Sequence, residues 1–214
     1  MAKIKLTKNE LKKQKDALKM YQRYLPTLLL KKQQLQVEIR SVEARRRELE
    51  AAREELEREF RAWIGVFGEG GAAPAYGADG RPLLSVSSIR TVSGNVAGVE
   101  IPVFQGADFE LAEYDLFASP LWIDPALDRL KKALLMDLER KVLAEQVRRL
   151  EHELRVTAQR VNLFEKVKIP ETQESIRRIR IYLGDQQTAQ VVRGKIAKRK
   201  VVAAAAAKAG GGEP

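Results

Sequence analysis

Apolar residues recur at alternating intervals of three and four along the first part of the chain. One class of positions runs in steps of seven from Leu11 to Phe67, and a second class runs in steps of seven from Gln14 to Trp63. Most residues in both classes are apolar, whereas the positions between them are largely charged or polar. A sustained seven-residue repeat is typical of the seam of a left-handed coiled coil. The pattern therefore predicts one long helix that ends at Phe67.

Local signals refine this first helix. Thr7 followed three residues later by Glu10 forms a capping box, so the helix is predicted to begin near Lys8. About sixty residues at a rise of about 1.5 Å span roughly 90 Å, which predicts a rod. Pro26 lies inside the pattern and predicts a kink, because its ring clashes with the preceding turn. Basic seam positions are expected to pack their stems and extend their heads into solvent, unless the helix pair is loose there or a third chain covers it. These positions are Lys32, Arg46 and Arg53.

The middle of the chain changes character. Residues 68–82 are rich in glycine, alanine and proline, which predicts a loop. Two runs rich in β-branched residues follow, at 86–92 and 96–103, and Ser-Gly-Asn at 93–95 lies between them. This arrangement predicts a β-hairpin with its turn at 93–95. Because an isolated hairpin is marginally stable in water, it should pack on the helices or on a partner.

A second long helical pattern occupies the rest of the chain. Asp124 before Pro125 predicts an N-cap followed by a proline at the first helical position. An apolar stripe then continues to Leu183, and the helical region is predicted to end near Lys200. Pro170 lies within this stripe and predicts a kink or an interruption.

Two long amphipathic helices joined by a loop are expected to fold back on each other, because each seam otherwise stays exposed to water. The predicted fold class is all-α: a long two-helix antiparallel coiled coil with a short β-hairpin and loop segment between the helices. Leu11 should then lie close to Leu183, and residues 191–200 should project as a single tip. The predicted seam comprises Leu11, Leu18, Leu25, Leu28, Leu35, Ile39, Val42, Leu49, Leu56, Leu150, Leu154, Val161, Ile176, Ile179 and Leu183.

The predicted organisation has four segments. Residues 1–67 form the N-terminal coiled-coil helix, and residues 68–123 form the glycine-rich loop, the hairpin and an acidic connector. Residues 124–200 form the C-terminal coiled-coil helix, and residues 201–214 form a disordered Ala/Gly tail.

Composition argues against catalysis by this chain. There is no cysteine, and His152 is the single histidine, so thiol chemistry and a histidine-based zinc site have no ligands to use. The glycines near residue 70 lack the Lys and Ser or Thr of a phosphate-binding loop. The expectation is a protein with no catalytic residue, cofactor or metal. No apolar run is long enough to span a bilayer and no secretory signal is present, so a cytoplasmic location without membrane insertion is expected.

Positive charge is concentrated near both ends of the chain. The net charge is +10, residues 1–40 contain eleven basic and three acidic residues, and residues 174–200 contain eight and two. If the helices fold back, both clusters come to one end and form an interaction surface. Nucleic acid would suit the charge, but no nucleic-acid-binding motif accompanies it. The candidate interface residues are Lys3, Lys5, Lys8, Lys12, Lys13, Arg193, Lys195, Lys198, Arg199 and Lys200.

Both helical segments resemble those of one known family. LTKNELKKQKDALKMYQRYLPTLLLKKQQL resembles the amino-terminal helix of the D subunits of V-type and archaeal-type rotary ATPases. RVNLFEKVKIPETQESIRRIRIYLGDQQTAQVVRGKIAKRK resembles their carboxy-terminal helix, with Arg160-Val161-Asn162 and Ile169-Pro170 as its clearest marks. The GDQQTAQVVRGKIAK ending resembles a bacterial branch. The resemblance covers roughly residues 4–66 and 121–200.

The resemblance implies the central rotor stalk of the ATPase. The coiled coil would turn inside the ring of catalytic A and B subunits, with its terminal end in the ring and the candidate basic residues against the inner wall. The F subunit of the central stalk would bind along the side, and a socket protein of the membrane sector, the C or d subunit, would receive the base. Two other classes remain open on the sequence. A prefoldin-like chaperone or other scaffold would need apolar helix tips, and a DNA-associated coiled coil would bind DNA in a salt-dependent manner.

Overall fold

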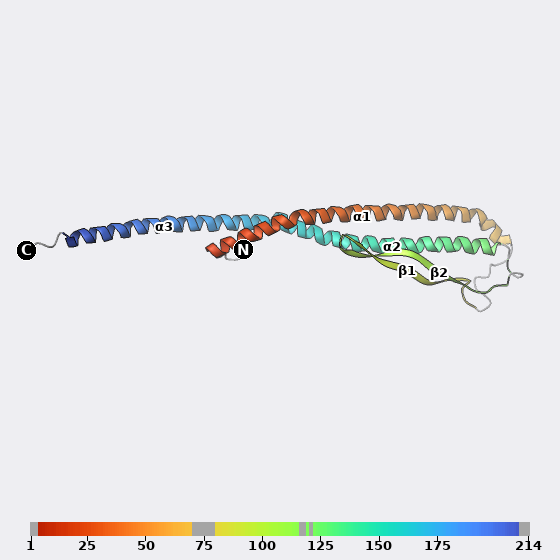
Figure 1. Ribbon diagram of the computed structural model, residues 1–214. Helices are drawn as coiled ribbons and strands as arrows, with labels where there is room; N and C mark the ends of the chain where they lie inside the picture. The colour runs from red at the N-terminus through yellow and green to blue at the C-terminus, as the bar shows by residue number, and fades with distance from the viewer. Residues whose placement is uncertain (1–3, 70–79, 116–118, 120–121, 210–214) are drawn as a thin grey trace, which may run out of the picture. The chain divides into compact units, whose positions relative to one another are not determined.

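The computed structural model describes residues 4–69, 80–115, 119 and 122–209, and Figure 1 shows the order of its elements. Long helices dominate, and a two-stranded antiparallel hairpin lies between them in the sequence. The elements are α1 (Lys8–Glu69), β1 (Leu84–Val96), β2 (Val99–Leu111), α2 (Ile123–Asn162), the π-helix η1 (Leu163–Lys168) and α3 (Ile169–Ala209). The predicted fold class is confirmed: long helices pack together, with a hairpin between them.

The chain divides into two compact units, which are described separately below. The terminal unit contains residues 1–29 and 159–214 and therefore the start of α1, the end of α2, η1 and α3. The central unit contains residues 30–158 and therefore the rest of α1, the hairpin and most of α2.

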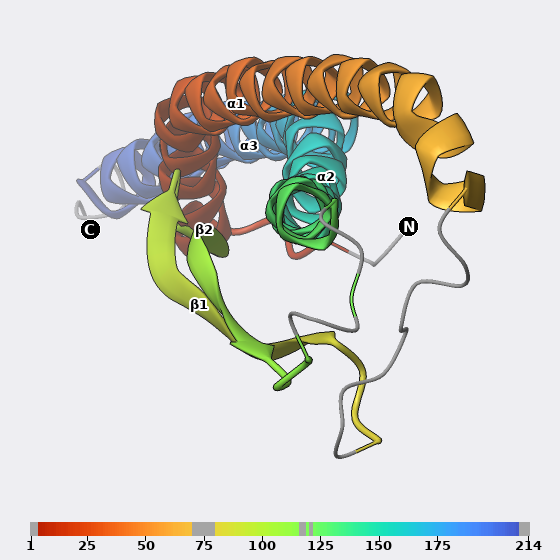
Figure 2. The same ribbon diagram turned by 90° about the vertical axis from the view of Figure 1, so that its right-hand side faces the viewer.

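The core of the central unit lies between α1 and α2. Leu35 and Leu150 are both completely buried there, and Ile101 of the hairpin closes the same core. The spacing of three and four explains this arrangement, because it keeps one apolar stripe of each helix facing the other. Figure 2 views α2 end on, with the hairpin beside it. The buried residues of this core are Leu35, Ile39, Val42, Leu49, Ile101, Leu143, Val147 and Leu150.

Ion pairs across the seam show that α1 and α2 run antiparallel in the central unit. Lys31 Nζ lies 2.6 Å from Glu153 Oε1, and Arg45 Nη2 lies 3.3 Å from Glu139 Oε1. The residue number therefore falls on α2 as it rises on α1. Half-exposed pairs of this kind contribute little stability, but they fit only one register of the two helices.

The basic seam residues of the central unit stay half-buried. Arg53 Nε lies 3.6 Å from Asp137 Oδ2 on α2, and Arg46 Nε lies 3.8 Å from Glu50 Oε1 on its own helix. Neither Nε has a hydrogen-bond partner among the described residues. Each side chain is half-buried and has an acidic neighbour, and the extension of their heads into solvent stays a prediction.

The terminal unit packs the start of α1 against η1 and α3. The rings of Tyr21 and Phe164 meet with their centroids 5.1 Å apart and their planes inclined by 51°. The predicted capping box is confirmed at the hydroxyl of Thr7, which accepts a hydrogen bond from the Glu10 backbone N–H at 3.3 Å. The buried residues of this unit include Val161, Thr172, Ser175, Ile176 and Ile179.

The π-helix η1 lies where the apolar stripe contains one extra residue. Seam positions advance in steps of three and four up to Phe164, and the next seam residue is Ile169, a step of five. The Ile169 N–H donates to the carbonyl of Phe164, which is the i→i−5 bond of a π-helix. The extra residue is thereby absorbed, and the stripe of α3 returns to the seam. The interruption predicted at Pro170 is this π-helix, which ends just before the proline. The chain stays helical through Pro170.

The hairpin is confirmed, but its turn is not where the sequence pattern places it. Ser-Gly-Asn at 93–95 lies inside β1, and the turn is formed by Ala97 and Gly98 with φ values of 50° and 79°. Positive φ at both positions matches the twist of the strands, and Asn95 Oδ1 accepts the Gly98 N–H at 3.0 Å. Gly94 has a packing role instead, because a Cβ atom there would lie 2.8 Å from Val103 Cγ2.

Two helix ends also differ from expectation. The α2 helix begins at Ile123, and the Asp124 carboxylate accepts a hydrogen bond from the Tyr114 hydroxyl where an N-cap was predicted. The α3 helix continues past Lys200 to Ala209, because alanine has the highest intrinsic helix propensity. The glycine-rich stretch at 70–79 and the last residues, 210–214, lie outside the described residues.

Candidate functional surfaces

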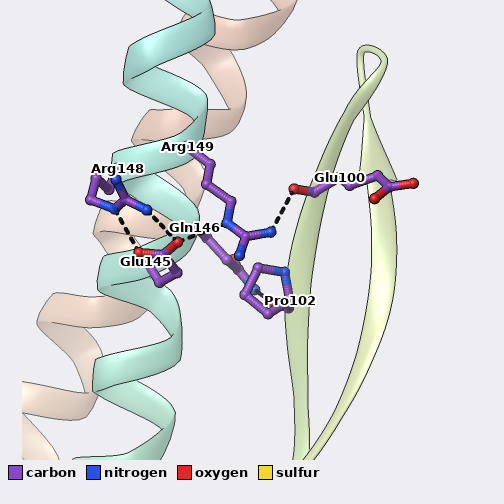
Figure 3. Close-up of polar contacts among 6 residues, drawn as sticks. All are labelled: Glu100, Pro102, Glu145, Gln146, Arg148 and Arg149. Carbon is purple, nitrogen blue, oxygen red and sulfur yellow. Dashed lines mark hydrogen bonds and ion pairs between the residues drawn. The ribbon is translucent and has the colours of Figure 1, made fainter.

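Two hydrogen bonds fasten the tip of the hairpin to α2. Figure 3 shows the Gln146 side-chain amide donating to the carbonyl of Pro102, and Arg149 Nη1 donating to the carbonyl of Glu100 at 3.2 Å. Ile101 lies between these two carbonyls in sequence and is buried in the core of the central unit. Gln146 is itself buried, so losing its acceptor would leave an unsatisfied amide inside the protein. The hairpin tip is therefore part of the folded central unit.

Glu145 orients the arginines beside this attachment. Its carboxylate accepts hydrogen bonds from Arg148 Nε at 2.6 Å and from Arg149 Nε at 2.8 Å. Hydrogen bonds from Arg148 and then from Arg149 lower the pKa of Glu145 to about 2. Arg149 thus connects a carboxylate on its own helix to the backbone of β2, which fixes the direction of its guanidinium group.

A second attachment lies at the open end of the hairpin. Leu83, Ile123 and Leu127 are buried together, and Tyr114 packs against them. The hydrogen bond from Tyr114 to Asp124 is the main cause that raises the pKa of Tyr114. The hairpin is consequently held at both ends by α2.

The two predicted basic clusters lie one after the other in the terminal unit and do not form a single tip. Leu6 and Gln14 line one crevice with Ser175 and Arg178, so the start of α1 lies against that part of α3. From Arg178 to Lys195 is roughly 25 Å along a helix at about 1.5 Å per residue. The basic residues of α3 therefore lie beyond α1, at the end that Figure 1 shows extending past the first turns of α1. The expected proximity of Leu11 to Leu183 stays a prediction, and Lys15 and Leu18 line a second crevice with Arg180 and Ile181.

All described members of the two clusters are exposed. On α1 and just before it these are Lys5, Lys8, Lys12 and Lys13, and on α3 they are Arg193, Lys195, Lys198, Arg199 and Lys200. Lys3 lies outside the described residues. The projecting part of α3 is thus a single helix with basic side chains open to solvent on it.

The same part of α3 carries exposed apolar side chains that were not among the candidate residues. Val191 is 58% exposed and Ile196 is 52% exposed, although both continue the apolar composition of the helix. The sequence pattern could have indicated this exposure, because the apolar residues of α3 continue past the part of the helix that α1 covers. The exposed apolar residues of this segment are Val191, Val192, Ile196, Val201 and Val202.

The predicted seam residues occupy two levels of burial. Those that the structure buries are Leu35, Ile39, Val42, Leu49, Leu150, Val161, Ile176 and Ile179. Those that it leaves half-buried are Leu11, Leu18, Leu25, Leu28, Leu56, Leu154 and Leu183. None of these side chains is exposed.

Within the described part of the chain, no three His, Cys, Asp or Glu side chains are grouped so that they could hold a metal ion. His152 is exposed on α2, beside Val99 and Arg149. No helix among the described residues has an apolar stretch long enough to cross a membrane.

Comparison with known proteins gives a consistent result over almost the whole chain. Residues 10–199 match the family described as the D subunit of ATP synthase. The chain is 46% identical over 202 residues to the V-type ATP synthase D subunit of Borreliella burgdorferi, covering 94% of this chain and 96% of that protein. It is 36% identical over 198 residues to the V-type ATP synthase D subunit of Chlamydia muridarum, covering 92% and 96%.

Proposed function

The chain belongs to the family of V-type ATP synthase D subunits and is a central-stalk component of the rotary ATPase, and from this premise we propose that it is the rotating axle. The axle transmits torque between a ring of catalytic A and B subunits and the membrane sector that translocates ions. The chain itself contributes no catalytic residue, and ATP is hydrolysed or synthesised in the ring. As part of this complex, we place the chain in the cytoplasm, peripheral to the membrane.

The paired helices support this mechanical role. A shaft transmits torque if separating or sliding its helices costs free energy over their length. Truncation of buried leucines such as Leu35 and Leu150 measures that resistance, since each fully buried aliphatic side chain contributes about 1.5–3 kcal/mol. The cross-seam ion pairs add specificity of register more than strength.

The projecting end of α3 is the observation that carries the proposal. Residues 190–205 of α3 are exposed, and the segment combines basic residues with apolar ones such as Val192 and Ile196. An unpaired helix of this composition fits a cavity with apolar walls and an acidic lining. We place it in the centre of the A/B ring, where charge complementarity guides insertion and apolar contacts hold the end.

The remaining partners follow from this orientation. The F subunit of the central stalk binds along the coiled coil, away from the projecting end, and the socket protein of the membrane sector, the C or d subunit, receives the opposite end. The proposal includes neither nucleic acid nor insertion into the membrane.

Reconstitution with A, B and F subunits tests the proposal. Replacing the α3 basic residues by glutamine should weaken recovery of the A/B ring by on the order of tenfold and leave F binding unchanged. The variant replaces Lys195, Lys198, Arg199 and Lys200. The matched control replaces Arg40, Arg47, Arg58 and Arg61, which are exposed on α1 of the central unit.

The outcomes separate the possible orientations. If the α3 variant fails to recover the A/B ring and the control variant recovers it, the result supports insertion of the α3 end into the ring. A variant that keeps the ring and loses F shows that the axle is oriented the other way round. If both variants recover the A/B ring equally well, the α3 end is not part of the interface with the ring.

A further inference from the structure

The two outer edges of the hairpin differ in their hydrogen bonding. The turn is closed by the pair Val96–Val99, and the strands continue in register to the pair Thr91–Phe104. Residues of an antiparallel ladder alternate between pairs that exchange hydrogen bonds and pairs whose N–H and C=O groups point outward. Because a two-residue turn is closed by a hydrogen-bonded pair, the outward-facing residues near the tip are the intervening ones. On β1 these are Thr91, Ser93 and Asn95, and on β2 they are Glu100, Pro102 and Phe104.

The outer edge of β2 is occupied near the tip. The outward carbonyls of Glu100 and Pro102 accept hydrogen bonds from Arg149 and Gln146 of α2. Pro102 has no N–H to leave unpaired, which is the expected use of proline at an outward position. Figure 3 shows β2 lying between α2 and β1, so α2 blocks approach to this edge.

The outer edge of β1 is open. Among the described residues, no hydrogen bond is made to the outward backbone groups of Thr91, Ser93 and Asn95. Natural sheet edges are protected by lysine, proline, β-bulges or inward-pointing charges. The two irregularities of this ladder, between Val86 and Ser88 and between Arg90 and Thr91, lie before the stretch from Thr91 to Asn95. The thirteen residues of β1 contain neither lysine nor proline, and their one charged residue, Arg90, is paired with Asp108 on β2. Such an edge is a template for an additional strand.

Exposed apolar side chains accompany this open edge. Val92 and Val103 form a cross-strand pair and are 48% and 41% exposed, and Ile89 is 48% exposed. An added strand would cover this surface as it pairs with the β1 backbone. The alternate side chains of that strand should therefore be apolar or β-branched.

The charge of the hairpin defines the partner further. Residues 84–111 carry one basic side chain, Arg90, and three acidic ones, Glu100, Asp108 and Glu110, so the hairpin has a net charge of −2 (1 − 3) within a chain of net charge +10. Figure 3 shows the Glu100 carboxylate directed away from α2. Two copies of the hairpin would repel each other, whereas a strand with basic residues at its ends would be attracted.

We propose that the outer edge of β1 from Thr91 to Asn95 binds an extended segment of another protein of the ATP synthase complex by β-strand addition. The segment has apolar or β-branched residues in its centre and a basic residue near Glu100. This inference rests on membership of the complex and does not depend on which end of the axle enters the ring.

Hydrogen exchange in the assembled complex tests the added strand. Backbone amides at Thr91, Ser93 and Asn95 should exchange at least about tenfold more slowly in the complex than in the isolated chain, because each N–H gains an acceptor. Amides of Val92 and Gly94 are already bonded to β2 and serve as internal references. Assembly without slower exchange at the outward positions overturns the strand addition and leaves the axle role intact.

A proline substitution supplies the matched variant. Ser93→Pro removes an outward N–H and leaves the ladder bonds of β1 in place, since Ser93 faces Pro102 in a pair without mutual hydrogen bonds. Ser93→Thr retains the N–H and is the control. With a photo-crosslinking residue at Thr91, the control should crosslink to one extended segment of another protein of the complex, and Ser93→Pro should reduce that yield at least about fivefold.

A charge variant keeps the test decisive if Ser93→Pro does not fold. Glu100→Lys retains the carbonyl that Arg149 binds and reverses the exposed charge. It should lower the crosslinking yield as well, and an unchanged yield contradicts the basic character assigned to the partner. A crosslink to a second copy of this chain, to a helical segment or to an acidic strand overturns the proposal.

Discussion

Truncation of Leu35 is the sharpest test of the packed seam in the central unit. Leu35 is completely buried, and it lies in the core that Leu150 and Ile101 share. Fully buried Leu→Ala substitutions cost about 2–5 kcal/mol, because transfer free energy is lost and a cavity remains. Three elements enclose this site, so collapse around the cavity is restricted. We therefore expect Leu35→Ala to lower the free energy of unfolding by about 2–4 kcal/mol.

Leu30→Ala is the matched control on the same helix. Leu30 is 55% exposed, so its truncation should change the free energy of unfolding by less than about 0.5 kcal/mol. Urea denaturation followed by far-ultraviolet circular dichroism gives both values, and an unchanged slope shows that the denatured states are comparable. If Leu35→Ala is no more destabilising than Leu30→Ala, the buried face of α1 has been assigned incorrectly.

Two further predictions concern local structure. The Glu145 carboxyl has a pKa of about 2, below its ordinary value of 4.5, so its stabilising interaction is complete above about pH 4.5 and is lost as the pH falls towards 2. Nuclear magnetic resonance titration should show this pKa rising in Arg148→Gln, and an unchanged value would exclude Arg148 as the main cause. Deleting Lys166 should convert η1 to α-helix and preserve the melting temperature, because the step from Phe164 to the next seam residue becomes four. Deleting the exposed Arg155 instead should lower the melting temperature by shifting the stripe, and equal effects of the two deletions would refute the role given to η1.

Periodicity predicts the helices well because burial in a coiled coil is decided by spacing along one chain. Leu35, Ile39 and Val42 follow the repeat and are buried, and the capping box at Thr7 depends only on neighbouring residues. The step of five from Phe164 to Ile169 is also visible in the sequence. Whether this step forms a π-helix depends on how α1 packs against the residues before and after it. The sequence pattern alone does not give that packing.

The errors arise where distant residues decide between local alternatives. Ser-Gly-Asn is a good turn sequence, but Gly94 is needed to accommodate Val103 on the opposite strand, so the turn moves to Ala97 and Gly98. The basic clusters were expected to converge because the register of the helices was unknown. That register depends on contacts such as Tyr21 with Phe164, which place the start of α1 well before Lys195.

The helical state of the α3 end has a consequence for the entropy of assembly. Starting a helix in water is unfavourable because several residues must be ordered for the first hydrogen bond, whereas each later residue adds a bond of its own. The packed part of α3, around Ile176 and Ile179, provides that start, and the alanines after Val202 favour continuation. Ordering one residue costs about 1–2 kcal/mol of backbone entropy. In α3 this entropy is lost when the chain folds, before the segment binds a partner. A segment ordered before it meets its partner retains more of its contact energy as affinity.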